Sequence, residues 1–487
     1  MKFRGILDIN KDSKEFYKKE KSTESFRNNY HFQPPFGLIN DPNGLSFFNG
    51  EYNIFFQWNP LTCEHKFKHW GLIKTKDFIN YSIPKVVLAP NDYYDKNGCY
   101  SGSAIEKDGV LELLYTGNVK DENDSRLSYQ CIAIMDKEGN IEKLGPVLDS
   151  VPKGYTSHFR DPKVYFKDGK YYFVIGAQRE KFKGRVLLYS SLDMRKWNLE
   201  GEIKTSLENF GYMWECPTII SLEGKDILVF SPQGLEKEEF KYQNIYQSGY
   251  ITGNLNYDTL EFEHGDFYEL DMGFDFYAPQ VFEDDKNRTL MIGWMGVPEE
   301  DEDKHLSLKE NWMHSLTIPR KLTLNEGRIY QNPVEEMNSL REKTFFYKEN
   351  FSEKYLEFSD VNKNSYEFLL NIKRDSNLEF KIEMFKGEKE YFDLYFKEGT
   401  FIISRENIID GPKGIRKFKL KESKNLKLRI FVDKSAVEIY INDGECVASS
   451  RVFAKENSLG LSLEGLNKQI NIEKLQIWTL KGVNYNE

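Results

Sequence analysis

Apolar and aromatic runs alternate with tight turns along the first three fifths of the chain, and the pattern repeats. Each copy has an apolar run, a turn and a second apolar run, and the turn is Asn-Gly or Asp-Gly in three copies. Such turns are typical of two-residue β-hairpins because both central residues need a positive φ. The copies span residues 45–56, 104–115, 164–175, 219–230 and 281–292. We therefore predict five β-hairpins in this part of the chain.

The five turns are evenly spaced. Gly50, Gly109, Gly169, Gly224 and Asn287 lie 59, 60, 55 and 63 residues apart. Each interval has room for about four short strands with their loops, which is the content of one propeller blade. The spacing therefore predicts a five-bladed β-propeller over residues 30–335. A β-sandwich with hairpins at coincidental spacing is the alternative interpretation.

A different pattern begins after about residue 345. Apolar and polar residues alternate over several segments separated by turns, which predicts the strands of a β-sandwich. Residues 332–344, just before this change of pattern, carry helix-forming residues after a proline and predict a short helical connector. The whole chain is thus expected to be all-β. Its predicted parts are a lead-in segment (1–29), the propeller (30–335), a linker (336–345) and the sandwich (346–487).

The positions before each turn suggest where chemistry could gather. Counting back nine residues from the turns gives Asp41, Tyr100, Arg160, Glu215 and Ala278, and Asp161 follows Arg160 directly. Equivalent positions on the first strands of a propeller surround one central channel. We therefore expect Asp41, Asp161 and Glu215 to converge on one funnel.

Composition narrows the class of protein. There are 67 Lys and Arg against 77 Asp and Glu, a net charge of −10, and basic residues sit among acidic neighbours, which disfavours nucleic-acid binding. Aromatic residues make up 15% of the chain, far from a disordered composition. The N-terminal residues contain no apolar stretch of signal-peptide or membrane-spanning length, so we expect a cytoplasmic protein with no membrane partner. The five cysteines are widely spaced without a CxxC pair and indicate reduced thiols.

Three converging carboxylates would repel one another, and a fold keeps such a group only at a cost in stability. Carboxylates among aromatic side chains suit glycoside hydrolysis, in which one attacks the anomeric carbon and another protonates the leaving oxygen. Each motif also has a structural interpretation, such as a turn at Asp41-Pro42-Asn43-Gly44. A calcium site and a nucleophilic Cys216 are further alternatives, although no Asp-x-Asp loop and no partner histidine accompany them. We expect no metal and no cofactor.

Five motifs resemble glycoside hydrolase family 32, the β-fructofuranosidases. Residues 31–44 begin with His and end in Asn-Asp-Pro-Asn-Gly, like the N-terminal signature of that family. The other matches, in the order of the family, are Tyr-Ser-Gly-Ser (100–103), Phe-Arg-Asp-Pro (159–162), Trp-Glu-Cys-Pro (214–217) and Phe-Tyr-Ala-Pro-Gln (276–280). Residues 431–445 also look like the sandwich of that family, so the resemblance covers nearly the whole chain.

The resemblance implies a retaining mechanism and a role for each acid. Asp41 would be the nucleophile, Glu215 the general acid/base and Asp161 a stabiliser of the transition state. We expect the neighbouring carboxylates to raise the pKa of Glu215. The residues that would bind the sugar are Asn40, Gln57, His65, Tyr100, Ser101, Arg160, Tyr277 and Trp294.

Within the family, residues 63–65, 93–100, 230–234 and 242–248 look most like bacterial sucrose-6-phosphate hydrolases. The implied substrate is sucrose 6-phosphate, and sucrose as well; invertase or fructan hydrolase activity on unphosphorylated sugars is the alternative. A non-catalytic carbohydrate-binding propeller is disfavoured because all three acids are present. A phosphate needs cationic or amide donors at the rim of the funnel, and the candidates are His65, Lys66, Lys68, His69 and Lys96. The sequence leaves the oligomeric state open, a homo-oligomer included.

Overall fold

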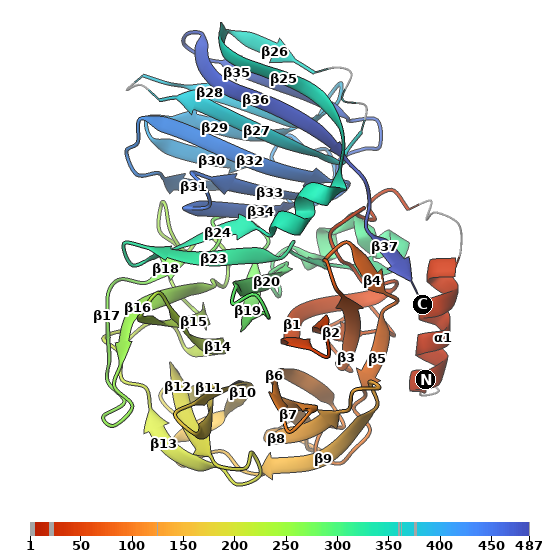
Figure 1. Ribbon diagram of the computed structural model, residues 1–487, viewed down its shortest axis with the longest axis vertical. Coiled ribbons are helices and arrows are strands. Elements are labelled where there is room, and N and C mark those ends of the chain that lie inside the picture. Colours follow the sequence, from red (N-terminus) through yellow and green to blue (C-terminus); the bar gives the residue numbers. More distant parts are fainter. Residues whose placement is uncertain are drawn as a thin grey trace.

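The computed structural model describes residues 5–18, 24–123, 125–358, 361, 363–374 and 377–486. Five β-sheets form a ring, and two further sheets stack beyond one side of it (Figure 1). The protein is therefore all-β, a five-bladed propeller followed by a β-sandwich, as predicted. The described residues also contain one α-helix, α1 (Ile6–Lys18), and three 3₁₀-helices, η1 (Glu302–Lys304), η2 (Leu306–Glu310) and η3 (Glu335–Leu340).

Each blade is built of consecutive antiparallel strands that follow one another outward from the centre of the ring (Figure 1). Blade 1 contains β1 (Gly37–Phe48), β2 (Glu51–Asn59), β3 (His69–Thr75), β4 (Asn80–Ser82) and β5 (Lys85–Leu88). Blade 2 contains β6 (Gly98–Lys107), β7 (Val110–Lys120), β8 (Arg126–Met135) and β9 (Ile141–Leu148). Blade 3 contains β10 (Tyr155–Lys167), β11 (Lys170–Arg179), β12 (Lys183–Ser191) and β13 (Asn198–Glu202).

The last two blades carry additional short strands. Blade 4 contains β14 (Met213–Leu222), β15 (Lys225–Gln233), β16 (Gly249–Leu255), β17 (Phe262–His264) and β18 (Tyr268–Glu269). Blade 5 contains β19 (Tyr277–Glu283), β20 (Thr289–Met295), β22 (Ser315–Leu316), β23 (Arg320–Asn325) and β24 (Arg328–Pro333). The strand β21 (Trp312–Met313) leaves blade 5 and pairs in parallel with β1, which closes the ring.

The predicted hairpins join the first and second strands of the blades. Both central turn residues have a positive φ in the first four, for example 53° at Asn49 and 77° at Gly50. The prediction of two-residue turns is therefore confirmed for these blades. In blade 5 the connection is longer, and Asn287 alone has a positive φ of 56° in it.

Every inner strand contains a β-bulge at a matching place. At each bulge the inner strand advances by three residues while the second strand advances by two. The bulges lie at residues 39–42, 99–102, 160–163, 215–218 and 277–280. In the last three blades the extra residue is left-handed, with φ of 69° at Asp161, 49° at Cys216 and 47° at Ala278. Such bulges re-aim side chains and are frequent beside active sites.

Two six-stranded sheets make the sandwich. One is ordered β25 (Arg341–Glu353), β36 (Ile470–Leu480), β27 (Tyr366–Lys373), β32 (Asn425–Asp433), β33 (Ala436–Ile441) and β34 (Cys446–Arg451). The other is ordered β26 (Tyr355–Glu357), β35 (Gly460–Gly465), β28 (Phe380–Lys386), β29 (Phe392–Lys397), β30 (Thr400–Ser404) and β31 (Ile415–Lys419). Between propeller and sandwich, η3 takes up the middle of the predicted helical connector, and β25 begins five residues before the predicted sandwich boundary.

Both terminal elements, the helix α1 and the strand β37, lie on the outside of blade 1 (Figure 1). The strand β37 (Asn484–Asn486) pairs in parallel with β4. Helix α1 lies against β5, where Asn10 Nδ2 donates to the carbonyl of Val86 over 3.1 Å and Ser13 Oγ to that of Pro84 over 2.6 Å. The C-terminal segment thereby ties the sandwich back to the first blade.

A buried polar network joins the propeller to the sandwich. His31 contacts Asp433 over 3.1 Å and Glu438 over 3.2 Å, and all three side chains are buried. Burial alone would lower the pKa of His31, but its hydrogen bonds to the two carboxylates outweigh this effect and raise the pKa. Arg320 donates to Glu438 over 2.7 Å and to Asp271 over 3.2 Å. The histidine that opens the N-terminal motif therefore lies at this interface and not among the pocket-lining residues.

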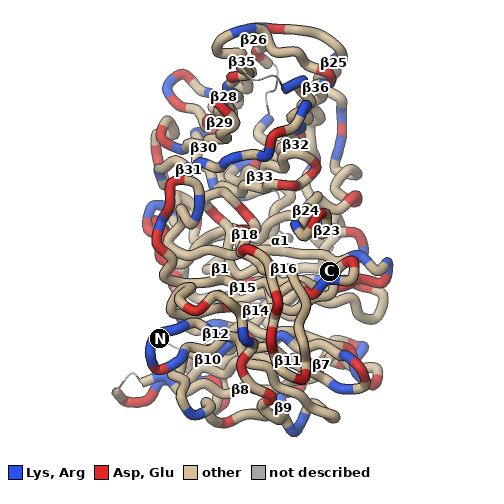
Figure 2. The backbone as a smooth tube through the Cα atoms, turned by 90° about the vertical axis from the view of Figure 1, so that its left-hand side faces the viewer, with Lys and Arg blue, Asp and Glu red and all other residues tan. Residues whose placement is uncertain are grey.

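Basic and acidic residues are interspersed over propeller and sandwich alike (Figure 2). All five cysteines are free, as their spacing predicted. No helix among the described residues is long and apolar enough to cross a membrane.

Candidate active site

One pocket of about 440 Å³ contains all three predicted acids. Every residue predicted to bind the sugar also lines it, which confirms that these positions converge. The full lining consists of Asn40, Asp41, Gln57, His65, Lys68, Tyr100, Ser101, Arg126, His158, Arg160, Asp161, Tyr212, Glu215, Gln233, Tyr246, Tyr277, Trp294, Pro298 and Glu299.

The β-bulges bring consecutive residues into the same pocket. Side chains of neighbouring residues point to opposite faces in a regular strand. At the bulges, by contrast, both members of the pairs 40–41, 100–101 and 160–161 line the pocket. In blades 1 to 3 the extra residue of the bulge therefore doubles the number of polar residues that the inner strand contributes, whereas blades 4 and 5 contribute Glu215 and Tyr277 alone from their bulges.

The bulges also correct the equivalent positions that were obtained by counting nine residues back from each turn. Strand pairing places Asn40, Tyr100, Asp161, Cys216 and Ala278 at the equivalent position. Counting back from the turns was wrong by one residue in blades 1, 3 and 4. In blade 1 the reason is a second bulge between residues 43 and 46, and in blades 3 and 4 the shared bulge lies one residue nearer the turn than in blade 2. The predicted convergence survives because the shift is small.

The sequence reasoning missed the residues that come from the second half of each hairpin and from the loop that follows it. The end of a second strand lies beside the bulge of the first, and the loop to the third strand rises over the same end of the blade. Gln233, Tyr246, Pro298, Glu299 and Arg126 reach the pocket in this way, whereas His158 and Tyr212 precede the inner bulges. Pairing each hairpin across its turn would have pointed to Gln233.

Asp41 is held by two neutral donors. Asn40 Nδ2 donates to Oδ1 over 2.9 Å, and Ser101 Oγ donates to Oδ2 over 2.5 Å. Burial raises the pKa of Asp41, while these two hydrogen bonds oppose that rise and the charge of Glu215 adds to it. The donors favour the ionised carboxylate and fix its orientation.

Glu215 is surrounded by donors on both oxygens. Arg160 donates to Oε1 through Nε over 2.8 Å and through Nη2 over 2.5 Å. Gln233 and Tyr277 donate to Oε2 over 2.8 and 2.6 Å. Burial would raise the pKa of Glu215, but the charge of Arg160 and these hydrogen bonds outweigh burial and lower it. The expectation of a raised pKa is therefore wrong, because Arg160 hydrogen-bonds directly to Glu215.

Asp161 differs from the other two acids in its left-handed backbone and in a pKa raised to about 7. It has a left-handed backbone, and its Oδ2 accepts a hydrogen bond from the amide of Cys216 over 3.1 Å. Burial raises its pKa to about 7, with Glu215 and Asp41 adding to the rise and Arg160 opposing it. With a pKa of about 7 Asp161 is partly protonated near neutral pH, so the proton that the cluster shares lies on Asp161 and not on Glu215, whose pKa is lowered.

The remaining predicted binding residues surround these acids. Gln57 Nε2 donates to the carbonyl of Cys99 over 2.9 Å. The ring of Trp294 lies edge-on to that of Tyr277 with centroids 6.1 Å apart, and its buried Nε1 has no hydrogen-bond partner. An unpartnered donor of this kind is available to a ligand hydroxyl.

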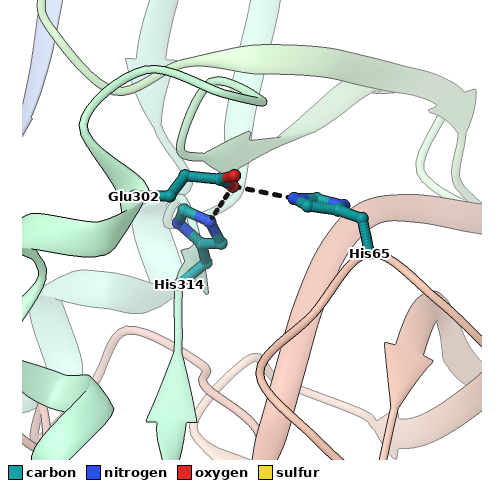
Figure 3. Close-up of side chains that lie close together, drawn as sticks. All are labelled: His65, Glu302 and His314. Atoms are coloured by element: carbon teal, nitrogen blue, oxygen red, sulfur yellow. Dashed lines mark hydrogen bonds and ion pairs between the residues drawn. The ribbon is translucent and has the colours of Figure 1, made fainter.

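A chain of contacts runs from the rim of the pocket to Asp41. Glu302 Oε1 lies 2.7 Å from His65 Nε2 and 2.8 Å from His314 Nε2 (Figure 3). His65 Nδ1 lies 3.2 Å from Lys68 Nζ, which donates to Asn40 Oδ1 over 2.5 Å. Because Asn40 then donates to Asp41, the chain fixes which way the amide of Asn40 faces.

His65, Glu302 and His314 are also the group of described residues that could hold a metal ion. Their three ligand atoms lie within 4.8 Å of one another. The same carboxylate oxygen already bonds both imidazoles, however, so the contacts are satisfied by hydrogen bonding alone.

The five phosphate candidates are separated by the fold. His65 and Lys68 line the pocket, while Lys66, His69 and Lys96 do not. Lys66 pairs with Glu64 over 3.2 Å, and His69 bonds the carbonyl of Phe67 over 2.6 Å. Burial lowers the pKa of Lys68 to about 7.

Comparison with known sequences gives a consistent result. The N-terminal domain of glycosyl hydrolases family 32 matches residues 31–333, and the C-terminal domain of that family matches residues 336–479. A sucrose-6-phosphate hydrolase from Bacillus subtilis is 40% identical over 473 residues, 94% of this chain and 95% of that protein. One from Staphylococcus xylosus is 38% identical over 490 residues, 99% of this chain and 98% of that protein.

Solved structures agree with the sequences. A sucrose-6-phosphate hydrolase from Lactobacillus gasseri superposes with a TM-score of 0.88 at 31% identity, over 98% of this chain and 97% of that one. A β-fructofuranosidase from Bombyx mori, a mutant in complex with sucrose, has a TM-score of 0.85 at 29% identity, over 99% of this chain and 98% of that one.

Proposed function

This chain belongs to glycosyl hydrolase family 32, and on that basis we propose that it cleaves the β-fructofuranosyl bond of sucrose 6-phosphate to fructose and glucose 6-phosphate. The names of its relatives support the substrate. The observation that carries the reaction type is the pocket itself, in which one buried and two partly buried carboxylates lie in three different hydrogen-bonding environments. Environments that push acid pKa values apart separate a nucleophile from a proton donor.

In the proposed mechanism, Asp41 attacks the anomeric carbon of the fructosyl unit. Its carboxylate is ready for this role because Ser101 and Asn40 orient it and favour its ionised form. The bond to the glucosyl oxygen breaks as the bond to Asp41 forms, which gives a covalent fructosyl-enzyme. Water then releases fructose with net retention.

Glu215 is proposed as the general acid that protonates the leaving oxygen and then as the base that activates water. In the unliganded pocket Arg160 holds Glu215 ionised. A sugar whose hydroxyls accept hydrogen bonds from Arg160 would draw the guanidinium away from Glu215. We therefore propose that substrate binding raises the pKa of Glu215 and moves the shared proton onto it.

Asp161 is proposed to accept hydrogen bonds from fructosyl hydroxyls and to strengthen them as positive charge develops on the sugar. Asn40, Gln57, Tyr100, Tyr277 and Trp294 are proposed to line the same subsite. Trp294 supports this assignment with its unpartnered Nε1.

A second candidate is hydrolysis of unphosphorylated sucrose, favoured by the relative that is in complex with sucrose. Comparing kcat/KM for sucrose 6-phosphate, sucrose and inulin separates the candidates. We expect the phosphorylated sugar to be the best substrate. Equal or higher kcat/KM for sucrose or inulin would refute the phosphate preference without refuting the reaction type. Since a sugar phosphate does not cross a membrane unaided, we also propose a cytoplasmic location.

A further inference from the structure

Arg126 differs from the other cations that line the pocket. His65 is paired with Glu302, Lys68 with Asn40, and Arg160 with Glu215. Arg126 lines the same pocket, yet its guanidinium has neither an ion pair nor a hydrogen-bond acceptor in the part of the chain that the structure describes. Its nearest recorded contact is the face of the Tyr100 ring, 5.7 Å from the centroid.

Arg126 comes from the third strand of blade 2. It is the first residue of β8, directly after the loop that leads over the pocket end of blade 2. Its side chain is partly exposed, whereas Arg160 is buried, with only 8% of its surface accessible. The charges of Arg160, Glu215 and Asp161 all act on Arg126, so it lies close to the acids.

We propose that Arg126 binds the phosphate of the 6-phosphoglucosyl group and so determines the preference for a phosphorylated substrate. The inference rests on the proposed function and names the residue that confers it. A partly buried guanidinium without a partner has lost water without gaining an anion, and a phosphate would supply that anion through paired hydrogen bonds. Glu215, the proposed proton donor to the leaving glucosyl oxygen, lines the same pocket as Arg126.

The other cations are less suited to this task. Lys68 is already engaged with Asn40 and His65, and withdrawing it would release the amide that orients Asp41. His65 has both ring nitrogens engaged, by Glu302 and Lys68. The net charge of −10 opposes a phosphorylated substrate, so a local unpaired cation is the feature that offsets this field.

The test compares Arg126→Ala and Arg126→Lys with Arg179→Ala as the matched control. Arg179 is a half-exposed arginine of blade 3 that pairs with Glu202 outside the pocket. We expect the ratio of kcat/KM for sucrose 6-phosphate to that for sucrose to fall about 10- to 100-fold in Arg126→Ala, mainly through KM. Arg126→Lys should fall less because a lysine keeps the charge but not the paired donors. Arg179→Ala should keep the wild-type ratio.

A second readout separates failure of this inference from failure of the proposed function. With sucrose as substrate, glucose 6-phosphate should inhibit the wild type more strongly than Arg126→Ala, whereas glucose should inhibit both equally. If the wild type prefers sucrose 6-phosphate and Arg126→Ala keeps the same ratio, the role of Arg126 is overturned. If the wild type shows no preference, the proposed substrate is wrong, and equal inhibition of both proteins by glucose 6-phosphate overturns the role of Arg126 as well.

Discussion

Asp41, Asp161 and Glu215 share one buried pocket but differ in their neighbours. Asp41 has two neutral donors, Glu215 has an arginine and two further donors, and Asp161 has a backbone amide. The number and charge of these donors decide which acid is ionised, because burial acts on all three in the same direction. At this scale the chemistry depends on single hydrogen bonds.

Replacing Asp41 by Asn should abolish most of the activity. The amide keeps the shape of the side chain but cannot attack the anomeric carbon, so we expect kcat to fall at least about a thousandfold, or ~4 kcal/mol. Steady-state kinetics on sucrose 6-phosphate measures the loss, and thermal unfolding checks that the variant is folded. Near-normal turnover in a folded variant would refute the assignment of Asp41 as nucleophile.

Replacing Asp161 by Asn should stabilise the protein at alkaline pH. The folded state raises the pKa of Asp161 from 3.8 to about 7, so it binds this proton more tightly than the unfolded chain does. The stabilisation of the folded state by this proton is therefore complete below pH ~4, where the unfolded chain is protonated as well. It is lost as the pH rises through ~7, where the folded protein releases the proton. We expect the Tm of Asp161→Asn to exceed that of the wild type at pH 8 and the difference to shrink toward pH 4.

The control for this experiment is Asp168→Asn, an exposed turn residue of the same blade. It should leave the pH dependence of Tm unchanged. A Tm difference for Asp161→Asn that is equal at pH 4 and pH 8 would contradict the raised pKa.

At the scale of elements, the active site is the product of one bulge repeated five times. In blades 1 to 3 the bulge turns two consecutive residues of an inner strand toward the pocket, and the loops between second and third strands supply further lining residues. The loop between β20 and β22 extends this principle, because its 3₁₀-helix η1 holds Glu302 against His65 of blade 1. Two loops from different blades thereby orient one asparagine on the pocket floor.

Glu302→Gln should weaken catalysis although Glu302 itself does not line the pocket. The amide oxygen can still accept from both imidazoles but lacks the negative charge that strengthens these bonds, so His65, Lys68 and Asn40 are held less firmly. We expect kcat/KM to fall about tenfold for sucrose and sucrose 6-phosphate alike, or ~1.4 kcal/mol. The exposed neighbour Asp303→Asn should behave like the wild type. A loss confined to the phosphorylated substrate would show that Glu302 acts on phosphate binding and not through Asn40.

At the scale of the whole molecule, the sandwich is joined to the propeller by buried charge as well as by apolar contacts. Arg320 of blade 5 lies between Asp271 and Glu438, and His31 lies between Glu438 and Asp433. Arg320 and Glu438 are 118 positions apart in the sequence, and His31 and Glu438 are 407 apart. The network depends on both parts being in place, because the sandwich alone would leave Asp433 and Glu438 without His31 and Arg320.

Arg320→Leu should destabilise the protein strongly. It leaves Glu438 and Asp271 buried without their cation, and breaking a buried pair in this way costs about 3–5 kcal/mol. Urea unfolding measures the change. Lys427→Ala, which removes the exposed partner of Asp443, is the comparison and should change the free energy of unfolding by less than about 1 kcal/mol. Similar effects of the two substitutions would contradict a stabilising role for the interface network.

The sequence by itself determined the hairpins, their number and the blade that each acid belongs to. Those features follow from local rules, since a turn such as Asn49-Gly50 and an apolar alternation on either side of it specify a hairpin without reference to the rest of the chain. The motifs around Asp41, Arg160 and Glu215 were equally visible. A propeller then places equivalent strand ends together by symmetry.

Only the tertiary structure decided the geometry and charge of the site. A bulge interrupts the two-residue alternation of side chains in a strand, and no residue type in the sequence marks its position. Counting back from the turn therefore missed Asn40, Asp161 and Cys216 by one position. The lowered pKa of Glu215 depends on an arginine from the neighbouring blade, and the contact between Glu302 and His65 joins residues 237 positions apart. Such contacts come from how the blades close on one another, and a pattern confined to one strand does not contain them.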